Sequence, residues 1–299
     1  MRKTVYKILA LGLCVTACAL SGSCSKDELG PTIFDATEYP LDPNSITFPL
    51  DTFCKKNFLE PYNLKYIYRM EDTGSDMSYN LVPCSYDQSV TLAVLCKYLW
   101  YDVYHDSIEN GELFLKKYSP RIIHVIGSPA FNPAQGTEVL GTAEGGLKIT
   151  LYNANNLSPD NIDYMNEYFF KTMHHEFSHI LNQNANRPNE FDRISNGKYN
   201  AVNWNDTEEL VALGQGFVSP YASSQAREDW VEVISNYIVK DTITWNEMME
   251  NASFQWEYVK DVDAVYWDKL DKKVKNGTAD RDSVGFFVRG TSTSGDETS

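Results

Sequence analysis

The spacing of apolar and polar residues predicts both helices and strands. Apolar residues recur every three or four positions over 88–105 (QSVTLAVLCKYLWYDVYH), a period typical of a buried helix. The β-branched run 121–127 (RIIHVIG) and the alternating run 145–153 (GGLKITLYN) predict two strands. The segment between them, from 127 to 146, is rich in Gly, Pro, Asn and Thr, and we expect a loop or hairpin there.

The alternation within 145–153 predicts a strand that is half buried. Leu147, Ile149 and Leu151 would share the buried face, because successive side chains of a strand point to opposite sides. The residues that would face away from the core are Lys148, Thr150 and Tyr152.

Three further segments have the period of helices. The tripeptide Ser-Pro-Asp at 158–160 is a helix start, with an N-cap serine, proline at the first position and an acid near the positive end. This helix would run from about 159 to 184, and two more helices are expected at 224–240 and roughly 254–274. The apolar stripe of the first comprises Ile162, Met165, Phe169, Met173, Phe177, Ile180 and Leu181. Together these elements predict an α+β fold, with a small mixed β-sheet packed on one side of a helical body and a mainly helical C-terminal part.

The N-terminus has the pattern of a secretory signal over residues 1–23, with a basic start and a short apolar run that ends at LSGSC. It resembles a bacterial lipoprotein signal, which implies that Cys24 carries the lipid. Cys18, in VTAC, is a second processing site that fits the pattern, and a plain cleaved signal is the other alternative. Acidic residues after Cys24 resemble the surface-export signal of gut-type Gram-negative bacteria, although Lys26 interrupts them.

The remaining chain predicts a tether at 24–45, one domain at 46–275 and a polar, frayed tail at 276–299. With 299 residues, of which 42% are hydrophobic, the chain can bury a sizeable core. The formal net charge of −15 excludes a nucleic-acid binder, which needs a positive stripe. Removing residues 1–23 takes away three basic residues and no acids, so the charge becomes −18. Membrane attachment would therefore depend on the lipid.

Three cysteines follow Cys24, and an odd number cannot all pair within one chain in an oxidising compartment. Cys96 lies in an apolar run and is expected to be a buried thiol. A Cys54–Cys84 bridge is possible, and the sequence leaves it open.

The main chemical signal is HEFSH at 175–179, which matches the H-E-x-x-H pattern. A spacing of four places His175 and His179 on one helix face, where both imidazoles can bind one Zn²⁺. Glu176 lies one step round the helix and is expected to reach a water rather than the metal. His174 points about 100° away and is expected to be a surface or supporting residue, not a ligand.

A catalytic zinc ion needs a third protein ligand, and the sequence offers several downstream acids. The metzincin pattern is absent, because Asn182 and Ala185 stand where Gly and His would be. The candidates are Glu190, Asp192, Asp206, Glu208, Glu209, Glu228, Asp229 and Glu232. Only Glu228 and Glu232 lie four apart on a strong helix with apolar residues between them. We expect Glu228 to bind the metal and Glu232 to accept the second N–H of a ligating histidine.

The segments HEFSH, GFVSPYA at 216–222 and EDWVE at 228–232 resemble the gluzincin metallopeptidases. More closely, they are similar to zinc-binding metallopeptidases described as substrate import-associated zinc metallohydrolase lipoproteins. The resemblance spans most of 45–260 and implies a gluzincin-like zincin fold. In gluzincins of the lethal-factor type a tyrosine lies seven residues before the glutamate ligand, as Tyr221 lies before Glu228, which implies that its hydroxyl steadies an oxyanion. The thermolysin N-E-x-x-S-D signature is not matched.

Two functions follow from these features. The first is a zinc-dependent peptidase in which Glu176 is general base and acid, with a peptide substrate lying along strand 145–153 as a sheet edge. The lipoprotein-like start implies lipid anchoring to the outer membrane, and the acidic stretch after Cys24 implies exposure at the cell surface. The family resemblance implies a TonB-dependent transporter with its surface binding lipoprotein as partners. The second is a non-catalytic accessory lipoprotein that captures peptide or glycan. The complete set of His175, His179 and Glu176 favours the enzyme.

Overall fold

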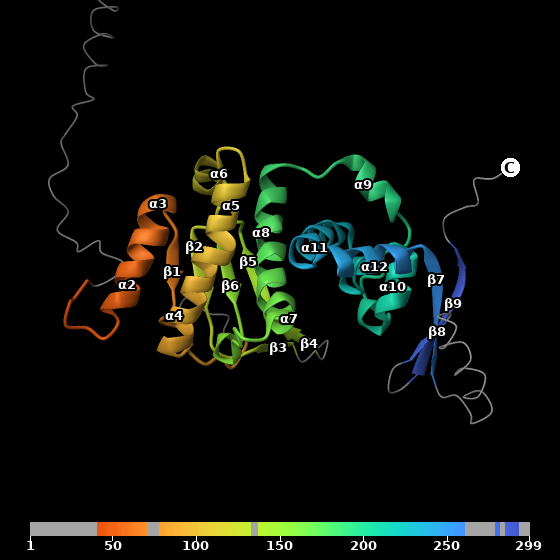
Figure 1. The fold of residues 1–299 in the computed structure, drawn as a ribbon, viewed down its shortest axis with the longest axis horizontal. Coiled ribbons are helices and arrows are strands. Elements are labelled where there is room, and N and C mark those ends of the chain that lie inside the picture. Colours follow the sequence, from red (N-terminus) through yellow and green to blue (C-terminus); the bar gives the residue numbers. More distant parts are fainter. Residues whose placement is uncertain (1–40, 71–77, 133–136, 261–278, 282–284, 293–299) are drawn as a thin grey trace, which may run out of the picture. The chain divides into compact units, whose positions relative to one another are not determined.

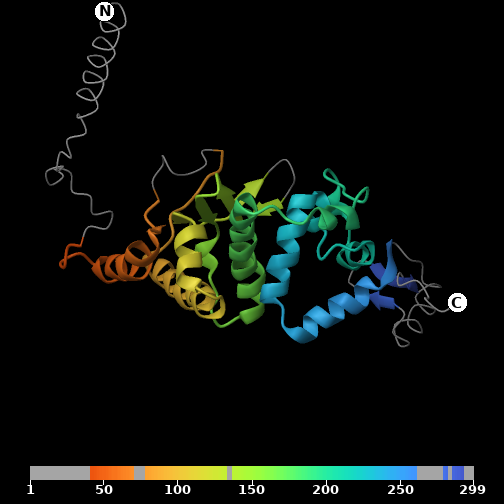
Figure 2. The ribbon, with the colours of Figure 1, turned by 90° about the horizontal axis from the view of Figure 1, so that it is seen from above.

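The computed structural model describes residues 41–70, 78–132, 137–260, 279–281 and 285–292. The signal segment 1–23, Cys24 and most of the tether lie outside the described residues. Figures 1 and 2 show long helices packed on a small sheet, followed along the chain by a mainly helical part and a second sheet. The α+β class predicted from the sequence is confirmed. Within the described residues, no helix is both long and apolar enough to cross a membrane.

The sheet beside the candidate site has four strands in the order β1 (Lys65–Ile67), β2 (Ile122–Val125), β6 (Lys148–Leu151) and β5 (Gly141–Glu144). The first three are parallel, and β5 is antiparallel to β6. The two predicted strands are therefore present, but β6 lies inside the sheet. The expectation that 145–153 forms the edge is wrong, because residues assigned to the loop or hairpin form the edge strand β5.

The prediction that this strand is half buried is also wrong. Ile149, Thr150 and Leu151 are all at most 2% exposed, whereas Leu147 is 59% exposed and precedes the strand. Strand β6 has a neighbour on each side, β2 and β5, and residues on both of its faces are buried. Thr150 compensates for its polarity, since its hydroxyl donates to Glu144 Oε1 at 3.3 Å.

A long helix from 86 to 107 packs on one side of this sheet and confirms the helix expected at 88–105 (Figure 1). It consists of α4 (Tyr86–Leu95), a π-helical turn (Cys96–Tyr101) and α5 (Asp102–Ser107). It contacts the metal-motif helix closely, because Cys96 Sγ lies 3.7 Å from Met173 Sδ. Cys96 is a buried free thiol, as predicted, and Cys54 and Cys84 are also buried and free, so the structure contains no bridge between them.

The helix with the H-E-x-x-H motif runs from 162 to 184. It is made of α7 (Ile162–Met165), a π-helical turn (Asn166–Phe170) and α8 (Lys171–Asn184). Its start differs from the prediction: Asn161, not Ser158, is the N-cap, and its side chain accepts from the Tyr164 amide at 3.0 Å. Ile162 consequently lies outside the apolar stripe and is 71% exposed.

The C-terminal part begins with helices, and α11 (Ala226–Val239) confirms the helix expected at 224–240. The prediction of a helix at 254–274 is wrong for residues 254–260, which form strand β7 (Phe254–Lys260). Residues 261–274 lie outside the described residues. The aromatic residues of FQWEYVK alternate, which is a strand period. Strand β9 (Gly285–Ser292) pairs with both β7 and β8 (Ala279–Arg281), so part of the segment expected to be a tail belongs to this second sheet.

The other elements complete the arrangement. The helices are α2 (Phe48–Cys54), a π-helical turn (Lys55–Leu59), α3 (Glu60–Tyr62), α6 (Gly111–Tyr118), α9 (Asn189–Ile194), α10 (Glu209–Gln215) and α12 (Thr242–Ala252). The strands are β3 (Ala130–Asn132), β4 (Thr137–Val139), β7 (Phe254–Lys260), β8 (Ala279–Arg281) and β9 (Gly285–Ser292). Short 3₁₀ turns lie at Ala154–Asn156, Trp204–Asp206 and Tyr221–Ser224.

Candidate metal centre

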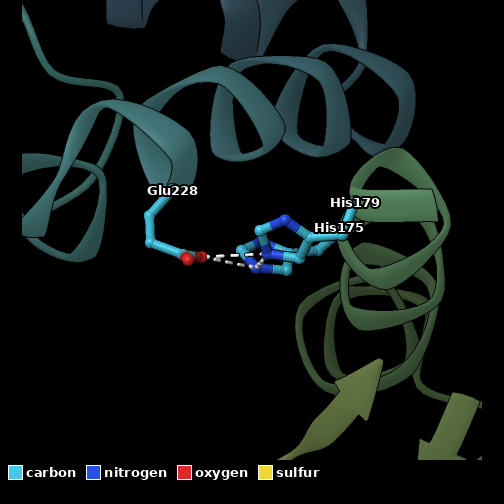
Figure 3. Close-up of side chains that lie close together, drawn as sticks. All are labelled: His175, His179 and Glu228. Atoms are coloured by element: carbon cyan, nitrogen blue, oxygen red, sulfur yellow. Dashed lines mark hydrogen bonds and ion pairs between the residues drawn. The ribbon is translucent and has the colours of Figure 1, made fainter. Parts of the chain in front are cut away.

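Helix α8 presents two histidines toward α11. It lies between the four-stranded sheet and α11, and its residues from 172 to 178 are all buried. The Nε2 atoms of His175 and His179 lie 3.2 Å apart, and their rings are nearly perpendicular (Figure 3). The spacing of four residues therefore brings two nitrogen donors to one point, as the helical period requires.

Helix α11 supplies a carboxylate at the same point. Glu228 Oε2 lies 3.2 Å from Nε2 of His175 and 3.0 Å from Nε2 of His179 (Figure 3). Two zinc ligands at tetrahedral angles are about 3.3 Å apart when each bond is about 2.05 Å long. The three separations are close to this value, and two imidazoles with a carboxylate are a donor set that suits zinc. The residues present therefore fit a zinc ion.

The other acidic candidates do not join this group. Within the described part of the chain, His175, His179 and Glu228 are the cluster of three metal-binding side chains with mutually close ligand atoms. Asp229 is buried but accepts from the Tyr199 hydroxyl at 2.9 Å, and Asp192 pairs with Arg187. Acids outside the cluster are Glu190, Asp192, Asp206, Glu208, Glu209, Asp229 and Glu232.

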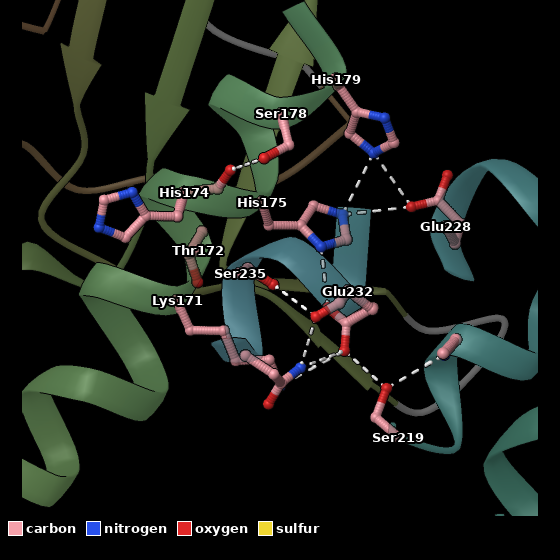
Figure 4. Close-up of polar contacts among 12 residues, drawn as sticks. Lys171, Thr172, His174, His175, Ser178, His179, Ser219, Glu228, Glu232 and Ser235 are labelled. Atoms are coloured by element: carbon pink, nitrogen blue, oxygen red, sulfur yellow. Dashed lines mark hydrogen bonds and ion pairs between the residues drawn. The ribbon is translucent and has the colours of Figure 1, made fainter. Parts of the chain in front are cut away.

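Glu232 lies behind His175, on the side away from Glu228. Its Oε1 is 2.8 Å from Nδ1 of His175 (Figure 4). A carboxylate can only accept, so Nδ1 carries the hydrogen and Nε2 is directed to the metal position. Burial opposes ionisation of Glu232, but the hydrogen bond from His175 and the ammonium of Lys171 lower its pKa to about 2. The structure thus places Glu232 where the sequence predicted a histidine-orienting acceptor.

The charge of the cluster favours a cation between its ligand atoms. Burial alone would lower the pKa of His175, but hydrogen bonds to Glu228 and Glu232 outweigh burial and raise the pKa to about 10. Burial likewise opposes ionisation of Glu228, whereas both histidines lower its pKa well below the usual range. A position that attracts a proton this strongly also attracts a divalent cation, and the two compete for the same nitrogen.

Two residues beside Glu228 restrain its second oxygen. Glu228 Oε1 accepts from the Arg227 side chain at 3.3 Å and from the side-chain amide nitrogen Nε2 of Gln225 at 3.4 Å. Oε2 is then the atom left to face the histidines. The sequence does not indicate roles for Lys171 and Ser219, because both reach Glu232 from other elements. Arg227 and Gln225 are neighbours of Glu228 at the start of α11, but their spacing alone does not indicate that they bond its carboxylate.

Glu176 faces a cavity of about 490 Å³ that adjoins the cluster. Its side chain is 7% exposed, and burial raises the pKa of its carboxyl. A raised pKa suits a group that takes and returns a proton near neutral pH. The edge strand passes directly over this residue: a Cβ added to Gly141 would lie 2.5 Å from Thr172 Cγ2 and 3.5 Å from Glu176 Cγ.

Tyr221 lines the same cavity. Its ring centroid is 5.9 Å from that of His175 and 4.9 Å from that of Trp204, and the residue is 37% exposed. Burial, followed by the charges of Glu228 and Glu176, raises the pKa of its phenol. The hydroxyl therefore keeps its proton and can donate to an anion formed in the cavity.

His174 is not part of the metal cluster, but it does not lie on the surface either. It is 4% exposed, and its Nδ1 lies 3.1 Å from the Tyr104 hydroxyl, on the far side of α8. Burial lowers its pKa to about 4, so the imidazole is neutral. The part of the expectation that placed it on the surface is wrong, because the helix 86–107 covers that face of α8.

A second cavity, of about 530 Å³, lies against α10 and β7 and is lined by Trp256, Lys198 and neighbouring residues. None of the clustered metal-binding side chains lines it. The chemistry of the residues, rather than cavity size, therefore selects the candidate site.

The comparisons with known proteins agree with this site. Residues 45–279 match the family described as "putative zinc-binding metallo-peptidase". A crystal structure with the same description, from Bacteroides caccae ATCC 43185, is 38% identical and covers 76% of this chain and 84% of its own, with a TM-score of 0.57. The search of curated proteins found no match.

Two histidines one helical turn apart and a glutamate from a second helix are the donor set of a His₂Glu zinc-binding protein. The family match and the 38% identical structure make this assignment more specific. The chain belongs to the family of putative zinc-binding metallo-peptidases, and the resemblance drawn from its motifs is confirmed.

Proposed function

We propose that the protein is a zinc-dependent peptidase in which His175, His179 and Glu228 hold the metal. The observation that carries the proposal is the convergence of three ligand atoms beside a buried glutamate in one cavity. A bound zinc ion polarises a substrate carbonyl and lowers the pKa of a water molecule toward neutrality. The remaining steps belong to side chains of this chain.

Glu176 takes the proton of the attacking water and delivers it to the leaving amine. Tyr221 donates its hydroxyl hydrogen to the oxygen that becomes negative during the attack. Glu232 keeps the hydrogen of His175 on Nδ1, so that Nε2 remains a donor to the metal. An extended peptide would pair with the free edge of β5, which passes over Glu176.

The test of catalysis is replacement of Glu176 by Gln, which keeps the size of the side chain and removes its basicity. The variant should bind about one zinc ion per chain, as measured by elemental mass spectrometry, and lose roughly 10²- to 10⁴-fold in kcat on a peptide library. Unchanged cleavage in this variant would show that Glu176 is not the base. A library left uncut by zinc-loaded wild-type protein would instead indicate a non-catalytic binding protein.

The proposal includes a place in the cell. We infer that the protein is attached to the outer membrane through a lipid on Cys24, faces the cell surface, and serves a TonB-dependent importer and its surface binding lipoprotein. The basic and apolar start of the sequence supports this inference. Metabolic labelling with palmitate should be lost in Cys24→Ala and kept in Cys18→Ala. Protease treatment of intact cells should degrade the wild-type protein if it faces outward.

A further inference from the structure

The hydroxyl group of Ser219 lies between Glu232, which is bonded to His175, and the turn that carries Tyr221. Ser219 is buried, and its Oγ donates to Glu232 Oε2 at 2.6 Å. The same oxygen accepts from the backbone N–H of Ala222 at 3.1 Å. Figure 4 shows Ser219 beside Glu232, on the opposite side of that carboxylate from His175.

The first of these bonds restrains the orientation of Glu232. Lys171 Nζ and Asn236 Nδ2 also approach Oε2, at 3.6 and 3.4 Å, so the Ser219 bond is the shortest of the three. With Oε2 held by Ser219, Oε1 is directed at Nδ1 of His175, 2.8 Å away. Without the Ser219 hydroxyl, Oε2 would keep only the two longer contacts to Lys171 and Asn236, so the carboxylate would be held less firmly in this orientation.

The second bond restrains the backbone directly after Tyr221. Tyr221 opens the 3₁₀ turn Tyr221–Ser224, and Ala222 is the next residue. The turn has its own bonds to Pro220, because the Ser223 amide and hydroxyl both donate to that carbonyl. Those bonds close the turn on itself, whereas the Ser219 bond connects it to Glu232.

We propose that Ser219 is a positioning residue that sets the Tyr221 hydroxyl relative to His175. The Ser219 hydroxyl is bonded both to Glu232, which orients His175, and to the Ala222 amide, which follows Tyr221. It therefore aligns the Tyr221 hydroxyl with the imidazole of His175. This inference rests on the proposed function, since it assigns Ser219 to the same site. It predicts separate effects on metal binding, through Glu232, and on turnover, through Tyr221.

The test compares Ser219→Ala with Ser219→Thr, which keeps the hydroxyl, and with Ser223→Ala, which removes a hydrogen bond of the same turn that leads to Pro220. Ser219→Ala should raise the zinc Kd, measured by chelator competition, about 10-fold. At saturating zinc its kcat should fall about 10-fold, while KM changes less than about twofold. Ser219→Thr should recover both quantities, and Ser223→Ala should change neither.

Two double-mutant cycles assign the effects to the two bonds. In a Glu232→Gln background, Ser219→Ala should no longer weaken zinc binding. In a Tyr221→Phe background, it should no longer lower kcat. Full additivity in both cycles, failure of Ser219→Thr to recover, or equal effects of Ser223→Ala would overturn the inference.

The inference can be judged even if the proposed function fails. Should wild-type protein bind zinc but cleave no peptide, two measurements remain: the zinc Kd and the amide hydrogen exchange of residues 220–224. Ser219→Ala should still weaken zinc binding and speed exchange in that segment, where the Ala222 amide loses its acceptor. No change in either quantity would overturn the role of Ser219 independently of catalysis.

Discussion

Glu228 and Glu232 are one turn apart on α11, yet their surroundings give them different tasks. Glu228 meets both imidazoles at Nε2, and Arg227 and Gln225 restrain its other oxygen. Glu232 meets only Nδ1 of His175 and is otherwise held by neighbouring donors. In the proposed zinc site, Glu228 would therefore be a ligand, and Glu232 would align the ligand His175.

Removing these two side chains should therefore have unequal effects on zinc affinity. Glu232→Gln should raise the zinc Kd by roughly 10- to 100-fold, the usual effect of losing an outer partner. Glu228→Ala removes one of three ligands and should raise the Kd further, so that the purified variant holds little zinc. Elemental mass spectrometry and chelator competition measure both, with Glu190→Ala as a control acid outside the cluster. Zinc retained fully by Glu228→Ala would place the third ligand elsewhere.

The pair of histidines and both glutamates could be proposed from the sequence, because a helical spacing of four fixes which side chains share a face. Ser219 and Arg227 could not, since nothing in their spacing indicates a contact. Ser219 touches a residue 13 positions away, and only the path of the intervening turn brings them together. His174 shows the converse limit: its neighbours on 86–107 determine its burial, and they lie 70 positions earlier.

The edge strand β5 can lie over α8 because of one glycine. A side chain at 141 would collide with Thr172, which precedes His175 by three residues on α8. Glu176 Cγ would lie 3.5 Å from the same Cβ. If a peptide binds as proposed, the distance between the strand and the helix also sets the room for its carbonyl above Glu176.

Replacing Gly141 by Ala should push β5 away from Glu176 and lower kcat/KM by between about 10- and 100-fold, because a displacement near 1 Å can cost about 10²-fold. Zinc content should stay at the wild-type level, since the strand provides no ligand. Adding Thr172→Ser removes the Cγ2 atom in question and keeps the hydroxyl bond to the Tyr168 carbonyl, so activity should return. Unchanged peptide kinetics in Gly141→Ala would separate β5 from the substrate path.

The fold could be predicted as a class but not strand by strand. The periods over 88–105 and 224–240 were sufficient for their helices, because each has a long apolar repeat. The edge strand was missed because 141–144 has no alternating apolar residues, and its pairing with β6 decides its structure. At 254–260 the sequence predicts part of a helix, but the segment has a short aromatic alternation and pairs with β9 as a strand.

The charge of the chain extends into the candidate cavity. The formal net charge is −15, and the cavity lining includes five glutamates and one lysine. Two of the glutamates, Glu138 and Glu209, are exposed. A cleft with one sign of charge raises the local concentration of oppositely charged solutes.

Peptides with net positive charge should consequently be cleaved with a higher kcat/KM than acidic peptides of the same core sequence, by about 10-fold at low salt. The difference should shrink as salt rises, because the screening length falls from about 10 Å at 0.1 M to about 3 Å at 1 M. A series of peptides that differ only in flanking Lys or Glu measures the effect. Equal rates at low salt would mean that the local field at the cluster cancels the charge of the chain.

The three buried thiols of the domain have a practical consequence. Burial raises the pKa of Cys54, Cys84 and Cys96, so each is neutral and inert in the folded state. None of the three is bridged in the described part of the chain. Cys54 and Cys96 are 0% exposed, so an alkylating reagent can reach these two only when the surrounding residues separate. The rate at which these thiols are modified therefore reports how often the domain opens, and it can be measured on the native protein without an added probe.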